Sequence, residues 1–198
     1  MGAIQGIKKY DLSRLGGVLR LFPHQSCTPE VSKQYIPPKG RRFMSLTIGT
    51  RAPDFSLPAT DGREISLDSL KGRKVVLYFY PKDDTSGCTL EAQNFQALKA
   101  EFMAADTEIV GVSPDSLKSH DKFRAKYGLD FTLASDEATA MLQAYGVWVE
   151  KSMYGRKYMG VERTTVLLDR DGLIAQVWSK VKVPGHAEEV LKAAQALG

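Results

Sequence analysis

Cysteine and histidine are scarce in this chain of 198 residues, which contains only Cys27, Cys88 and three histidines. Two cysteines exclude a framework of several disulfides and a four-thiolate metal site. The histidines are scattered, so no metal-ligand spacing is present. The longest apolar block covers residues 75–80, far short of the roughly 18 residues of a membrane-spanning helix. We therefore expect a soluble globular protein without a metal or a membrane partner. Its expected location is the cytoplasm, where a lone thiol stays reduced.

Positive charge is in excess only in the first part of the chain. The net charge is +4, but residues 1–43 carry eight Lys or Arg against two acidic residues, and the remainder is slightly acidic. The same segment holds four prolines and no sustained hydrophobic period. We predict a basic, flexible N-terminal extension over residues 1–43 and one domain over residues 44–198. A near-neutral domain argues against nucleic acid as a partner.

Three interpretations of the extension stay open. It is a disordered tail, an organelle-targeting segment, or a stretch upstream of a natural start at Met44. Compact patterning begins just after Met44, which favours the third, whereas import into an organelle would change the expected location.

Hydrophobic periodicity predicts an α/β protein from residue 44 onward. Strands are predicted for residues 54–57, 74–80, 107–112, 130–133, 163–168 and 173–178. Helices are predicted for residues 88–102, 117–127, 138–145 and 185–197. The early strand–helix–strand units imply parallel strands, and the late hairpin implies an antiparallel addition. A central mixed β-sheet flanked by helices, the layout of a thioredoxin-like fold, is the expected architecture.

The chemistry is concentrated where the strand over residues 74–80 gives way to a polar loop and a helix. Cys88 opens that helix, so it faces unpaired backbone N–H groups and the positive end of the helix dipole, which favour thiolate over thiol. Thr85 lies three residues earlier and could hydrogen-bond the sulfur or an incoming oxygen. Pro81 could wall the pocket against water. The competing interpretation of Cys88 is a small, inert, buried side chain.

Pro81, Thr85 and Cys88 form P-x-x-x-T-x-x-C, which resembles the active-site motif of the peroxiredoxins. The longer string Y-F-Y-P-K-D-D-T-S-G-C-T-L-E-A is similar to the bacterioferritin comigratory protein, or peroxiredoxin Q, subfamily. Strings at residues 52–55, 154–160, 162–169 and 181–186 agree with it in order. The resemblance covers about residues 44–198.

This resemblance implies a thiol-dependent peroxidase of the antioxidant type that needs no cofactor and serves cell redox homeostasis. Cys88 would be the peroxidatic cysteine that attacks hydrogen peroxide or an organic hydroperoxide and becomes a sulfenic acid. Thr85 would orient the peroxide, Pro81 would shield the thiolate, and Arg163 would stabilise the developing charge. Without the resemblance, Arg163 would be a surface ion-pair residue beside Glu162. Glu91 is expected to be a solvated or loop-anchoring carboxylate rather than a general acid.

The chain departs from the subfamily pattern at the resolving cysteine. Many members carry it five residues after the first, where this chain has Gln93, and no cysteine follows Cys88. We therefore expect a one-cysteine mechanism whose sulfenic acid is reduced by thioredoxin, glutaredoxin or glutathione, in a monomer or weak homodimer. Cys27 on the extension is the remaining candidate for a resolving thiol, against the simpler view of an incidental thiol.

Two other functions compete with a peroxidase. A disulfide oxidoreductase or glutathione-dependent transferase would use the same thiol, but the chain has no C-x-x-C. A thioredoxin-fold redox sensor or binding protein would need no turnover.

Overall fold

The structure is a computed structural model that describes residues 46–153 and 155–198. The predicted extension over residues 1–43, Cys27 and the alternative start at Met44 lie outside the described residues, so the predicted domain organisation stays a prediction. Within residues 46–153 and 155–198, no helix has both the length and the apolar character to cross a membrane. Among the same residues, no cluster of three or more His, Cys, Asp or Glu side chains is arranged to hold a metal ion.

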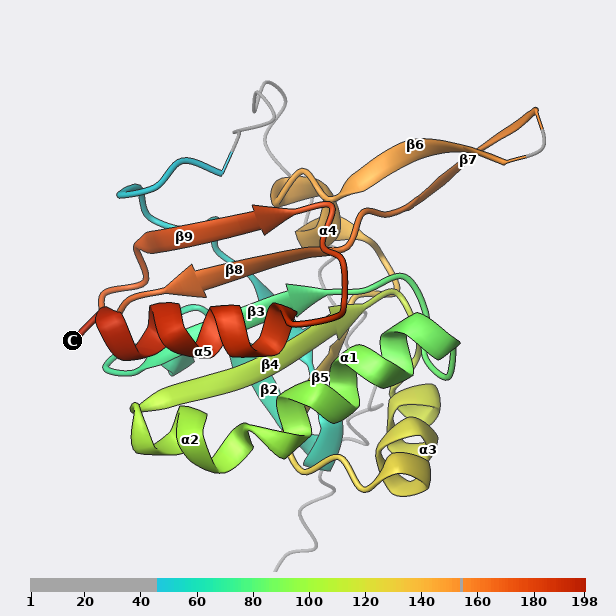
Figure 1. Ribbon diagram of the computed structural model, residues 1–198. Helices are drawn as coiled ribbons and strands as arrows, with labels where there is room; N and C mark the ends of the chain where they lie inside the picture. Colours follow the sequence, from blue (N-terminus) through green and yellow to red (C-terminus); the bar gives the residue numbers. More distant parts are fainter. Residues whose placement is uncertain (1–45, 154) are drawn as a thin grey trace, which may run out of the picture. The chain divides into compact units, whose positions relative to one another are not determined.

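A five-stranded mixed sheet forms the centre of the domain (Figure 1). Its strands, in spatial order, are β5 (Thr132–Ser135), β4 (Thr107–Ser113), β3 (Lys74–Phe79), β8 (Thr164–Leu168) and β9 (Ile174–Ser179). Strands β3, β4 and β5 are parallel, whereas β8 runs antiparallel to β3, and β9 to β8. Every residue of β3 is buried. The predicted central strand and the predicted antiparallel addition are both confirmed.

Helices cover both faces of this sheet, because alternate side chains of β3 point to opposite sides. Helices α1 (Ser86–Ala97), α2 (Lys99–Ala104), α3 (Leu117–Tyr127) and α5 (His186–Ala196) contribute to the cluster on one face, and α4 (Ala140–Ala144) to the cluster on the other. Val76, Tyr78 and Tyr80 pack into the first cluster, whereas Leu77 and Phe79 pack into the second. This two-sided burial explains why β3 is apolar throughout rather than alternating.

Three local features differ from the predictions. The helix predicted over residues 88–102 is two helices, α1 and α2, which are separated at Leu98 (φ −96°, ψ 3°). The strand predicted at residues 54–57 is β1 (Ser56–Pro58), which pairs with an unpredicted strand, β2 (Glu64–Ser66). Short 3-10 helices lie at Thr60–Gly62 and Asp68–Leu70.

A further unpredicted hairpin consists of β6 (Trp148–Met153) and β7 (Arg156–Val161). It extends away from the central sheet in Figure 1. The first four residues of β7 are exposed, so this strand lacks the buried face that produces an alternating pattern.

Candidate active site

Cys88 lies in the first turn of α1, directly after the loop that follows β3. Thr85 is the N-cap residue, and Cys88 is the third residue of the helix. The first helical hydrogen bond runs from the Thr89 N–H to the Thr85 carbonyl oxygen (2.8 Å), so the N–H groups before it have no helical partner. The thiol therefore lies at the positive end of the helix dipole, as predicted. Its side chain is only 1% exposed, which keeps water away from the sulfur.

The sheet register brings Arg163 to Cys88 across 75 positions of sequence. Thr164, the first residue of β8, pairs with Phe79, the last residue of β3. Arg163 therefore stands at the edge of the sheet from which the Cys88 loop departs. Its Nη2 donates a hydrogen bond to the Cys88 Sγ at 3.1 Å. A guanidinium at this distance stabilises negative charge on the sulfur.

The ion-pair partner of Arg163 is Glu91 on α1, not Glu162. Arg163 Nη1 donates to Glu91 Oε2, while the Glu91 side chain is only 1% exposed. The expectation of a solvated Glu91 is therefore wrong: helix α1 turns this carboxylate inward, one turn after Cys88. The pair fixes the guanidinium so that its other amino group faces the sulfur.

Burial raises the pKa of Glu91 from its ordinary value to about 7, although the charge and hydrogen bond of Arg163 oppose the shift. The second carboxyl oxygen, Oε1, is buried and has no hydrogen-bond partner among the described residues. An ionised carboxylate with one unsatisfied oxygen raises the free energy of the folded state when it is buried, so the neutral form is favoured.

This pKa predicts a pH-dependent difference in stability between the wild type and Glu91→Gln. The folded state binds the Glu91 proton more tightly than the unfolded state, so stability from this group is present at low pH and is lost as pH rises towards 7. Between pH 5 and pH 8 the wild type should lose about 2–3 kcal/mol of unfolding free energy relative to the glutamine variant. Denaturant unfolding at both pH values measures the difference. A change of opposite sign would show that Arg163 depresses the Glu91 pKa instead.

Thr85 and Pro81 lie in the loop between β3 and α1 that leads to Cys88. Their contacts differ from those of Arg163. The Thr85 hydroxyl donates to the carbonyl oxygen of Lys82 at 3.1 Å, within its own loop. Pro81 is half-buried and follows Tyr80, whose N–H bonds to the Val112 carbonyl oxygen (3.1 Å) at the end of β4. The structure thus gathers all four predicted site residues at one edge of the sheet. The direct hydrogen bond to the sulfur comes from Arg163.

Sequence reasoning missed a buried polar cluster beneath the same loop. Asp83 is 5% exposed and His120 is 0% exposed, and Asp83 Oδ2 lies 2.9 Å from His120 Nδ1. Tyr80 donates its hydroxyl to Asp83 Oδ1 at 2.8 Å. A helical signal for His120 existed, since it lies three and seven residues before the aromatic Phe123 and Tyr127 on α3. Spacing alone does not reveal that its partner is a loop aspartate.

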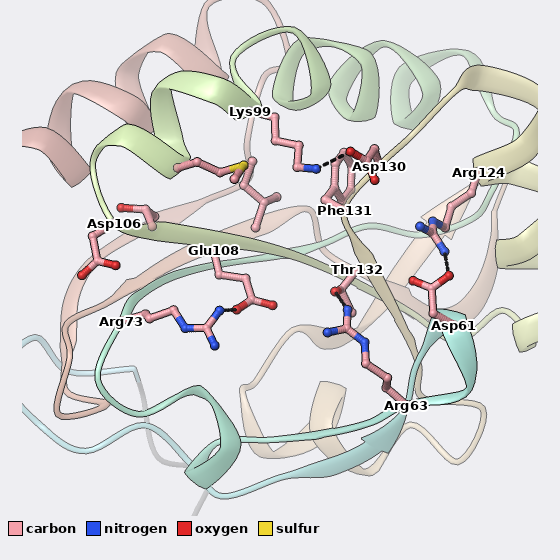
Figure 2. Close-up of a pocket in the computed structure, with 13 residues that line it drawn as sticks. Asp61, Arg63, Arg73, Lys99, Asp106, Glu108, Arg124, Asp130, Phe131 and Thr132 are labelled. Carbon is pink, nitrogen blue, oxygen red and sulfur yellow. Dashed lines mark hydrogen bonds and ion pairs between the residues drawn. The ribbon is translucent and has the colours of Figure 1, made fainter.

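A pocket of about 390 Å³ lies at the opposite edge of the sheet, where β4 and β5 begin (Figure 2). Six of its charged side chains form three pairs: Arg73 with Glu108 (2.8 Å), Lys99 with Asp130 (2.5 Å) and Arg124 with Asp61 (2.7 Å). Of the other two, Arg63 donates to the Thr132 hydroxyl (2.8 Å) and Asp106 pairs with Arg170 (3.1 Å). Cys88 is not among its lining residues. We therefore assign the candidate active site to the Cys88 junction and not to this pocket.

Comparison with known proteins identifies relatives of this chain. Residues 48–177 match the AhpC/TSA family. Peroxiredoxin Bcp of Bacillus subtilis is 44% identical over 149 residues, which cover 75% of this chain and 95% of the relative. Peroxiredoxin Bcp of Xanthomonas campestris is 48% identical over 143 residues, or 72% of this chain and 89% of the relative.

Solved structures agree with the sequence relatives. Xanthomonas campestris peroxiredoxin Q superposes with a TM-score of 0.72 at 46% identity, covering 75% of this chain and 97% of that one. Another structure, of the Xanthomonas campestris bacterioferritin comigratory protein, concerns its alkyl peroxide reduction activity. It gives a TM-score of 0.72 at 44% identity and covers 76% of this chain and 99% of that one. These likenesses confirm the expected thioredoxin-like fold class.

Proposed function

The chain belongs to the AhpC/TSA family of peroxiredoxins, and we propose that it reduces hydrogen peroxide and organic hydroperoxides with Cys88 as the nucleophile. The observation that carries this assignment is the hydrogen bond from Arg163 Nη2 to the Cys88 sulfur in the first turn of α1. The comparisons support the activity, because the relatives are named as peroxiredoxins and one is described as reducing alkyl peroxides. They disfavour a sensor or binding protein without turnover.

The reaction needs an ionised sulfur and a stabilised leaving oxygen. The Cys88 thiolate attacks the terminal oxygen of the peroxide, an S–O bond forms and the O–O bond breaks. The departing alkoxide or hydroxide takes up a proton and leaves as alcohol or water, and Cys88 becomes a sulfenic acid. Arg163 stabilises the negative charge while it spreads over sulfur and oxygen, helped by the N–H groups of the first turn of α1, which have no partner within the helix.

Thr85 and Pro81 have supporting roles in this proposal. The Thr85 hydroxyl leaves the Lys82 carbonyl oxygen, a neutral and local acceptor, to orient the bound peroxide. Pro81 limits access of water from the loop side. Both stand within the polar segment that joins β3 to α1.

An external thiol completes the cycle. Gln93, five residues after Cys88, offers no thiol, and Cys88 is the free cysteine among the described residues. A small thiol, glutaredoxin or thioredoxin attacks the sulfenic sulfur, water leaves and a mixed disulfide forms. A second thiol then releases the reduced Cys88. The enzyme would act in a thiol-reducing compartment, for which the cytoplasm is the proposed location, as a monomer or weak homodimer.

Intact-mass measurement after one equivalent of hydrogen peroxide, with dimedone present, tests the proposal. We expect a single dimedone adduct on Cys88, because the described residues contain no second cysteine that could trap the sulfenic acid. Cys27→Ser is the matched control and should give the same adduct. Loss of two hydrogens without an adduct, reversed by Cys27→Ser, would make Cys27 the resolving thiol. An unchanged mass would refute the peroxidase.

A further inference from the structure

Residues 81–85, which belong to the segment between β3 and α1, are tied to α3 and to Asp115, two residues before this helix begins. Among residues 81–85, Asp83 is the buried one. Its N–H donates to Asp115 Oδ2 at 2.8 Å, and its carboxylate meets His120 at 2.9 Å. The adjacent Asp84 points outward and accepts from Lys126 (2.7 Å) and Tyr127 (2.5 Å).

The contact between the Asp83 carboxylate and the His120 imidazole is buried. Burial would raise the pKa of Asp83, but hydrogen bonds from His120, Ser119 and Tyr80 outweigh burial and place it below its usual range. An ionised carboxylate only accepts hydrogen bonds, so His120 Nδ1 must carry the proton between them. The other ring nitrogen, Nε2, is buried without a hydrogen-bond partner among the described residues. The polar contacts of this imidazole are therefore directed at the loop side.

The segment held in this way carries the residue that orients the peroxide. Thr85 is two positions after Asp83, and Asp84 between them has a left-handed backbone (φ 57°) that its own contacts with α3 support. Release of Asp83 would let the segment relax and would displace the Thr85 hydroxyl relative to the sulfur. Arg163 would be unaffected, because Glu91 holds it from another element.

We propose that His120 is a positioning residue for peroxide reduction: by binding Asp83, it fixes the position of the Thr85 hydroxyl relative to the sulfur. This inference rests on the proposed function. It predicts a selective defect: the peroxide reaction uses the Thr85 hydroxyl, whereas alkylation of Cys88 by iodoacetamide depends on ionisation of the sulfur and access to it and does not use that hydroxyl.

The experiment compares both rates in His120→Leu, which removes the donor and keeps an apolar side chain of moderate size. We expect the second-order rate constant with hydrogen peroxide to fall by about 10- to 100-fold. Alkylation of Cys88 should stay within about twofold. His120→Asn should restore most of the peroxide rate, because its amide nitrogen can take the place of Nδ1 as the donor to Asp83.

A double-mutant cycle with Thr85 then tests the route of the effect. If His120 acts through Thr85, then Thr85→Val combined with His120→Leu should be no slower than Thr85→Val alone, within about twofold. The proposal would be overturned if the rate losses of the two single variants multiplied in the double variant. A normal peroxide rate in folded His120→Leu would overturn it as well. If that variant does not fold, Asp83→Ala, which removes the acceptor for His120 Nδ1, carries the same comparison.

These outcomes remain distinct from failure of the proposed function. Peroxide turnover in Cys88→Ser would refute the nucleophile assignment itself. A Cys88-dependent reaction that is indifferent to His120 would refute only the positioning role. Lys126→Met, which weakens the exposed tie to Asp84, is the matched surface control and should lose less than the buried variant.

Discussion

Cys88→Ser is expected to abolish peroxide reduction, by several orders of magnitude. A serine hydroxyl is almost entirely protonated near neutral pH, so it cannot provide the anion that attacks the peroxide oxygen. The substitution is close to isosteric, and the hydroxyl can still accept a hydrogen bond from Arg163, so the buried site should remain packed. Consumption of hydrogen peroxide with dithiothreitol as the external thiol is the measurement.

Cys27→Ser controls for the second thiol of the chain. It should retain the full rate with dithiothreitol, because the proposed cycle takes its resolving thiol from outside. Turnover that survives Cys88→Ser and disappears in Cys27→Ser would transfer the nucleophile to Cys27. A large loss in Cys27→Ser alone would make that residue part of the cycle.

The backbone elements that carry the site were predictable because each has a strong local signal. The apolar run that became β3 needs burial on both faces, and the turn of polar and small residues after it can only be a loop entering a helix. The position of Cys88 in the first turn of the helix follows from that order. Such reasoning places the thiol without any knowledge of the tertiary fold.

Contacts made through the sheet register were not predictable from local patterns. Arg163 reaches Cys88 only because β8 pairs with β3 in one register, and the sequence singled it out through family resemblance alone. Glu91 was misjudged for the same reason: a polar residue on a helix is normally solvated, and only the arrival of Arg163 makes burial of its carboxylate tolerable.

Two structural errors arise from the hydrophobic pattern, in opposite ways: at the break between α1 and α2 the pattern continues, and in the β6–β7 hairpin it is missing. Phe95, Leu98 and Phe102 keep helical spacing across the break between α1 and α2, so the apolar face continues while the helix bends. The β6–β7 hairpin has the reverse problem. Its exposed, charged strand has no buried face to give a period of two.

Arg163→Ala is expected to slow the reaction with peroxide by about 10²–10³-fold, the usual cost of removing one donor to a developing oxyanion. The guanidinium stays charged in its buried place: burial alone would lower its pKa, but Glu91 and the cysteine raise it above its usual value. Its loss removes stabilisation of the thiolate as well as of the leaving oxygen. Unlike the His120 variants, Arg163→Ala should therefore slow alkylation by iodoacetamide together with peroxide reduction.

Removal of Arg163 also leaves Glu91 buried without its cation, and this side effect has to be separated from the loss of the donor. The double variant Arg163→Ala/Glu91→Gln removes the carboxylate charge near the sulfur. If repulsion from Glu91 caused the defect, the double variant should recover most of the rate; if the missing guanidinium caused it, the double variant should stay slow. We expect the second result, because the hydrogen bond to the sulfur found among the described residues comes from the guanidinium, at 3.1 Å. Arg163→Lys should fall between the wild type and Arg163→Ala, since an ammonium keeps the charge but cannot bond Glu91 and Cys88 in one planar fork.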